Sequence, residues 1–121
     1  MAPGNAAADL RRLFERYKSR PFPRVGRALN PCDEVDVDLA EEDSYLAGLV
    51  ETFLRSGRID VKEIVLDQTL DERVERASTD LGTDGEALRT LKDYRDEMWH
   101  LARALGGASG VPVRPRHSTW P

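Results

Sequence analysis

The chain has 121 residues, a formal net charge of −4 and one cysteine. A chain of this length forms one domain with a modest core, which excludes a catalytic domain joined to a separate regulatory domain. A hydrophobic fraction of 40% and a charged fraction of 33% are typical of a soluble globular protein. No apolar run approaches the roughly 20 residues that span a bilayer. Residues 1–8 lack a secretory-signal pattern, and the lone Cys32 excludes an internal disulfide framework, so we expect a cytoplasmic protein.

The charges are separated along the chain. Residues 1–27, which we call the basic arm, carry seven bases and two acids, a net charge of +5. Residues 28–110 carry twenty acids and nine bases, a net charge of −11. This separation indicates either an external charged partner or contact between the basic arm and the protein's own acidic body.

The basic arm contains one short predicted helix over residues 9–18. Asp9 can cap it, and Leu10, Leu13, Phe14 and Tyr17 share one face at helical spacing. An apolar face of about two turns is too short to be stable alone, so the helix must dock on the body or on a partner. The prolines of residues 20–23 end the helix, and residues 28–37 are predicted to be an irregular connector.

The clearest element is an amphipathic helix from Asp38 to Gly57. Its apolar side chains recur at helical spacing, and Asp38 with Glu41 forms an aspartate version of a capping box. Gly57 follows the last periodic residue, where a left-handed conformation favours glycine. The apolar stripe of this helix comprises Leu39, Leu46, Leu49, Val50, Phe53 and Leu54.

Two more helical segments are predicted after it. In residues 60–81 the apolar side chains lie on two nearly opposite faces, which indicates one helix with a kink or break near Gln68. The next segment begins at Thr83 and ends at Gly106-Gly107, with a long stripe of apolar side chains. Residues 107–121 are rich in Gly, Pro, Ser and Arg and are predicted to be a flexible tail.

These elements predict an all-α fold. Short connections between the later segments favour antiparallel neighbours. We therefore expect a small antiparallel bundle in residues 38–106, built from three long helical segments, one kinked or broken, with the N-terminal helix docked on it.

Glu97 and His100 form a Glu-x-x-His pair on the last predicted helix. In ferritin-like carboxylate proteins this spacing places both side chains on one metal ion. At about 100° per residue both point away from the apolar stripe here, whereas a site in the bundle core needs inward ligands. A second such pair is absent from the sequence. A ferritin-like metal site is therefore a remote alternative, and we expect neither metal nor cofactor.

The densest run of acids precedes and enters the helix at 38–57. An EF-hand calcium loop starting at Asp36 would need glycine at its sixth position, which is Glu41. Negative charge at a helix N-terminus is favourable by itself, and the run can equally be a surface for a basic partner. The candidate protein-binding residues are Asp33, Glu34, Asp36, Glu41, Glu42 and Asp43, together with Trp99, a potential interface anchor.

The basic arm is the candidate nucleic-acid site. Bases interleaved with aromatic side chains can bind single-stranded nucleic acid, although the acidic body would repel phosphates. The bases are Arg11, Arg12, Arg16, Lys18, Arg20, Arg24 and Arg27.

No motif for catalysis is present in the sequence. Cys32 has no histidine beside it, and there is no nucleophile elbow and no phosphate-binding glycine loop. In general character the small, acidic, helical chain resembles bacterial immunity or antitoxin proteins and small adaptor subunits. We therefore expect a non-enzymatic protein-binding module (an inhibitor, immunity protein, adaptor or small subunit) whose partner is a basic protein or a second copy. The alternative is a nucleic-acid-associated regulator acting through the basic arm.

Overall fold

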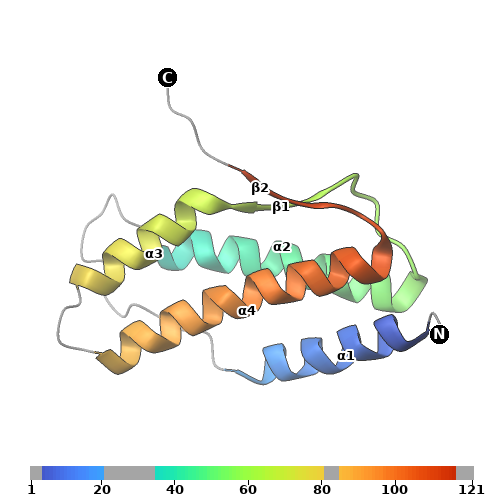
Figure 1. The fold of residues 1–121 in the computed structure, drawn as a ribbon, viewed down its shortest axis with the longest axis horizontal. Coiled ribbons are helices and arrows are strands. Elements are labelled where there is room, and N and C mark those ends of the chain that lie inside the picture. Colours follow the sequence, from blue (N-terminus) through green and yellow to red (C-terminus); the bar gives the residue numbers. More distant parts are fainter. Residues whose placement is uncertain (1–3, 21–34, 81–84, 117–121) are drawn as a thin grey trace.

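The computed structural model describes residues 4–20, 35–80 and 85–116. Within these ranges the chain forms four helices and two short strands (Figure 1). The elements are α1 (Gly4–Ser19), α2 (Val35–Ser56), β1 (Ile64–Asp67), α3 (Gln68–Asp80), α4 (Gly85–Ser109) and β2 (Val113–Arg116). The protein is therefore mainly helical, as predicted, but it is not strictly all-α. Among the described residues no helix is long and apolar enough to cross a membrane.

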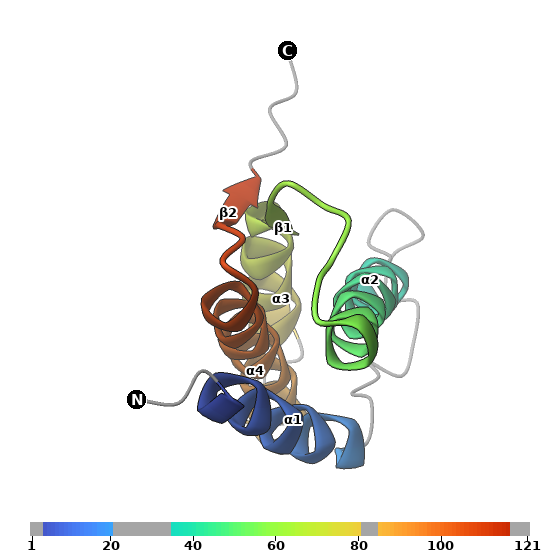
Figure 2. The ribbon, with the colours of Figure 1, turned by 90° about the vertical axis from the view of Figure 1, so that its right-hand side faces the viewer.

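The helix α4 packs against every other element of the fold. Figure 2 shows α1 crossing beneath α4 and α2, with α3 on the opposite side of α4 from α1. One core cluster collects buried side chains from all four helices and from β1. Its fully buried larger members are Leu10, Leu39, Leu46, Val50, Ile64, Leu66, Leu70, Val74, Met98, Leu101 and Leu105.

The N-terminal helix docks on the body, as predicted. Leu10, Phe14 and Tyr17 are buried, and α1 packs mainly against α4. The helix begins at Gly4, earlier than the predicted Asp9, because the alanines before Asp9 are strong helix formers.

The segment predicted as one kinked helix over residues 60–81 is instead a strand followed by a helix. In β1 the side chains alternate, with Ile64 and Leu66 fully buried and the residues between less so. The break predicted near Gln68 is present, but Asp67 caps α3, since its carboxylate accepts hydrogen bonds from the Thr69 backbone N–H (3.0 Å) and hydroxyl (2.6 Å). Four residues are too few to distinguish a short buried strand from a helix by periodicity alone.

The predicted flexible tail also contains structure. The strand β2 pairs in parallel with β1, with Ile64 opposite Val113. Residues 117–121 lie outside the described residues. Because a parallel strand pair needs a long crossover, β2 reaches β1 only after α3 and α4, and no local pattern in the sequence announces the pairing.

A glycine in the left-handed conformation follows the end of α2 and another follows the end of α4. Gly57 ends α2 as predicted, with φ +80°. At α4 the prediction was wrong, because the helix continues through Gly106 and Gly107 to Ser109, and Gly110 takes the left-handed conformation (φ +76°). A Cβ at Gly106 would lie 2.7 Å from Cγ2 of Val113. Gly106 therefore permits the close approach of β2 instead of terminating the helix.

Candidate protein-binding surface

The acidic run does not form one surface. Asp33 and Glu34 lie outside the described residues, and Asp36 lies in the first turn of α2. Glu41 is exposed, but the carboxylates of Glu42 and Asp43 form hydrogen bonds within the protein. Whether these acids bind a partner stays a prediction.

The Glu42 carboxylate joins α2 to β1 and α4. It accepts one hydrogen bond from the Arg95 guanidinium (2.6 Å) and one from the backbone N–H of Asp67 (2.7 Å). The Tyr45 hydroxyl contacts the backbone N–H of Val65 at 3.4 Å. These side chains cover the edge of β1 that β2 leaves open, so the strand does not present an unpaired edge to solvent there.

The Asp43 carboxylate joins three helices. Its Oδ1 accepts hydrogen bonds from the hydroxyl of Tyr17 on α1 and from that of Tyr94 on α4 (2.7 Å). The two tyrosine rings tilt against each other with centroids 5.2 Å apart. Burial, followed by the Asp43 hydrogen bond, raises the pKa of Tyr17 far above its usual value. Burial likewise raises the pKa of Tyr94, with the Tyr17 contact opposing the rise. Both phenols stay protonated at neutral pH, so neither is a base.

Arg95 is the one buried charged residue among those described, with 3% of its surface exposed. Besides Glu42, its guanidinium bonds to the Asp71 carboxylate (2.5 Å) and to the backbone oxygen of Asp67 (2.7 Å). A buried cation is tolerated when it is paired and hydrogen-bonded, and each of the three guanidinium nitrogens of Arg95 has an oxygen acceptor. It fixes α4 against α2, β1 and α3.

Trp99 lies one turn after Arg95 and is half-buried. Its indole Nε1 donates to both Asp71 oxygens, at 3.0 and 3.1 Å. The guanidinium of Arg95 lies 5.6 Å from the indole ring and that of Arg103 lies 5.7 Å from it, both within cation–π range. The indole is therefore held in one orientation while part of it faces solvent.

Two shallow hollows flank Trp99. One, of about 420 Å³, lies between α1 and α4 and includes Leu13, Asp96, His100 and Arg103 in its wall. The other, also about 420 Å³, lies between α3, α4 and β2. Trp99 and Arg103 line both hollows, and the second is completed by Gln68, Asp71, Val113 and Pro115. Both hollows are open to solvent, so neither has the enclosed shape of a small-molecule pocket.

Most described cations of the basic arm are engaged within the protein. Arg16 (3.1 Å) and Arg20 (3.6 Å) form ion pairs with Glu97 on α4. Arg12 pairs with Asp9 at 3.0 Å, and the Lys18 ammonium lies over the Phe14 ring. Arg11 is exposed beside a hollow between α1 and α2. Arg24 and Arg27 lie outside the described residues.

The Glu-x-x-His pair does not form part of a cluster of metal ligands. Glu97 is paired with Arg16 of α1 and with Arg20, which directly follows α1, and His100 is exposed on the rim of the first hollow. Within the described ranges there is no group of three or more His, Cys, Asp or Glu side chains placed to hold a metal ion.

Sequence reasoning identified Trp99 but missed Arg95, Asp71 and Arg103. Arg95 follows Leu91 by four residues and precedes Met98 by three, so it occupies the apolar stripe of α4, and a cation there signals a buried ion pair. No local signal marks Asp71, which reaches Arg95 and Trp99 only through the packing of α3 on α4.

The chain matches no protein-family model, no curated protein and no solved structure.

Proposed function

We propose that the protein is a non-catalytic protein-binding module whose contact surface is the outer face of α4 around Trp99. The observation that carries this proposal is the fixed, half-buried indole at the boundary of two open hollows. Tryptophan and arginine are the side chains most often found at the energetic centre of protein interfaces. Here the two are already stacked on each other.

Preorganisation of the indole supports this surface. An interface side chain that is already fixed loses little conformational entropy when a partner binds. The Trp99 ring is held by Asp71 and by two guanidinium groups before any partner arrives. The acidic run is less suited to bind a partner, because the carboxylates of Glu42 and Asp43 already form hydrogen bonds within the protein.

Nucleic-acid binding through the basic arm receives less support. A phosphate-binding surface needs cations that are free to replace counterions. Arg12, Arg16 and Arg20 are paired with carboxylates of the same chain. Of the described cations in the arm, Arg11 alone has neither an ion pair nor a ring contact. A single free cation is a small surface for nucleic-acid binding.

A site-specific photo-crosslink tests the proposal. A photoreactive phenylalanine analogue replaces the exposed His100, next to Trp99, and an identical one replaces the exposed Glu51 on α2 as a matched control. Irradiation in the native host should yield a discrete protein adduct from position 100 and none from position 51. Mass spectrometry then identifies the protein attached.

No adduct from position 100, or the same adducts from both positions, would contradict the proposal. A crosslink to nucleic acid instead of protein would favour the alternative function. Far-UV circular dichroism of both labelled proteins verifies that the substitutions leave the helices intact.

A further inference from the structure

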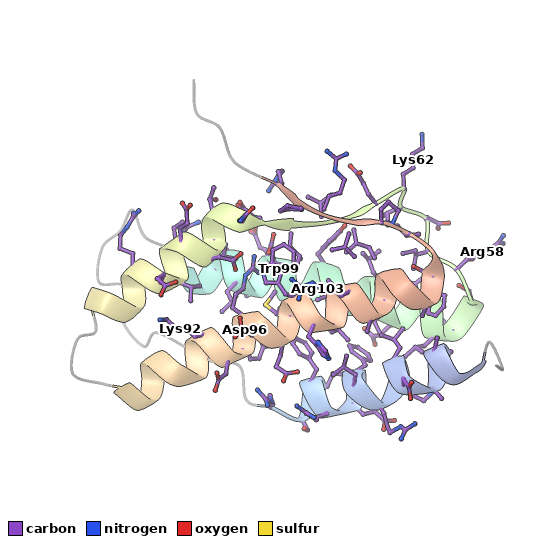
Figure 3. The ribbon with its side chains drawn as sticks, in the orientation of Figure 1. Arg58, Lys62, Lys92, Asp96, Trp99 and Arg103 are labelled. Carbon is purple, nitrogen blue, oxygen red and sulfur yellow. The ribbon has the colours of Figure 1, made fainter. Side chains whose placement is uncertain are left out.

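The outward face of α4 carries a stripe of four side chains, Lys92, Asp96, Trp99 and Arg103, spaced by four, three and four residues. This spacing places them in one row along a helix. Figure 3 shows the four labelled side chains following α4 along its length. We call this row the α4 stripe. It is the same surface that holds the two hollows beside Trp99.

The two charges that flank Trp99 have opposite signs and are unpaired within the described part of the chain. Asp96 and Arg103 are both exposed. Arg103 stacks on Trp99 without contacting a carboxylate, whereas Lys92 is already paired with Glu75 at 2.8 Å. The α4 stripe therefore offers one free acid and one free base, and it is complementary to a partner surface that carries a base opposite Asp96 and an acid opposite Arg103.

A second copy of the same chain supplies that reverse order. The midpoint between residues 96 and 103 lies between Trp99 and His100, so an antiparallel helix centred there brings Asp96 of each copy opposite Arg103 of the other. The two charges are seven residues apart, about 10.5 Å along the helix. Because a two-fold interface is self-complementary, both ion pairs form at once.

We propose that the α4 stripe is a homodimer interface in which α4 packs antiparallel against α4 of a second copy. This inference rests on the proposed protein-binding function and names its partner. Trp99 then lies next to the two-fold axis and meets its own symmetry mate. Leu13 in one hollow and Val113 with Pro115 in the other supply apolar surface on either side of the helix pair.

Charge reversal tests the pairing directly. The variants D96R and R103E each place two like-charged pairs across the interface, one on either side of the axis. Like charges opposed at an interface are strongly unfavourable, so each variant should dimerise at least about tenfold more weakly than the unaltered chain. An equimolar mixture of the two variants restores both opposite-charge pairs and should dimerise again, as should the double variant D96R/R103E. Sedimentation equilibrium measures all five samples.

Two controls separate the pairing from net charge. E41R on α2 and R58E in the loop after α2 change the net charge by the same amounts at exposed positions outside the α4 stripe. Figure 3 shows Arg58 at the far end of the molecule from Asp96. Both control variants should dimerise like the unaltered chain.

A monomeric unaltered chain, a dimer indifferent to D96R and R103E, or a mixture that stays monomeric would overturn the inference. These outcomes differ from failure of the proposed function. A monomer that still yields a photo-adduct with a different protein at position 100 overturns only the homodimer, whereas no adduct at all overturns the protein-binding function. A position 100 adduct of twice the chain mass supports both.

Discussion

Arg95 illustrates how a single residue can hold several elements together. Its guanidinium contacts groups from α2, β1 and α3 while its backbone belongs to α4. The cost of burying the charge is offset by two carboxylates and a backbone oxygen. Removing only the cation takes away the positive charge that the partly buried Glu42 and Asp71 carboxylates share, and the neutral donors that remain, the Asp67 backbone N–H and the Trp99 indole, do not balance their charge.

Replacement of this cation should therefore be severe. We expect Arg95→Met to lower the free energy of unfolding by about 3–5 kcal/mol, because it strands two partly buried carboxylates. Arg76→Met on α3, at an exposed arginine without an ion pair in the described ranges, should change it by less than about 0.5 kcal/mol. Urea unfolding followed by circular dichroism measures both. Equal effects of the two substitutions would show that the Arg95 network contributes no net stability.

The two strands show how an element depends on its neighbours. A pair of four-residue strands is not stable alone in water, and this pair persists because helices cover it. Side chains of α2 satisfy the open edge of β1, and Pro115 removes a backbone donor from β2. Gly106 of α4 lets β2 lie against the helix without a side chain between them.

The adjacent glycines of α4 should therefore respond differently to alanine. A Cβ at Gly106 would lie 2.7 Å from Val113 Cγ2 and 2.9 Å from the Val111 oxygen, so Gly106→Ala should destabilise the protein by about 1–3 kcal/mol. A Cβ at Gly107 meets nothing within 4 Å, and Gly107→Ala should stabilise it by up to about 0.5 kcal/mol through higher helix propensity. Thermal unfolding of the two variants tests the pair. Changes of the same sign would contradict the close approach of β2.

At the scale of the whole molecule, the Tyr17–Asp43–Tyr94 cluster couples three helices that are distant in sequence. The cluster therefore ties the docked α1 to both α2 and α4. Because burial raises the pKa of both tyrosines, the folded protein keeps the two phenolic protons at a pH where the unfolded chain loses them. The stability from this difference is complete below pH 10, the ordinary tyrosine pKa, and is lost as the pH rises further.

Alkaline unfolding should reveal this coupling. Above about pH 10 each of the two tyrosines should reduce the free energy of unfolding by about 1.4 kcal/mol per pH unit. Tyr17→Phe should remove about half of that slope, whatever its effect on stability at neutral pH. Urea titrations between pH 9 and 11 measure the slope, and an unchanged slope in the variant would mean that Tyr17 ionises freely in the folded protein.

The sequence determined most of the helical fold. Period and caps predicted α2 with its end at Gly57, the long stripe of α4, the docking of α1 and a break near Gln68. These features follow from local chemistry, since helix hydrogen bonds, caps and amphipathic faces are all set within a few residues. The helical class, and Trp99 as a residue of interest, were therefore accessible without coordinates.

Only the tertiary structure decided the strands and the roles of the polar side chains. The pairing of β1 with β2 joins residues about fifty positions apart, and short strands leave no distinctive period. Glu41, Glu42 and Asp43 are consecutive acids, yet one is exposed and two are bonded within the protein. The sequence sets the charge of these three side chains. What each charge contacts depends on the direction in which the side chain leaves α2 and on which element packs there.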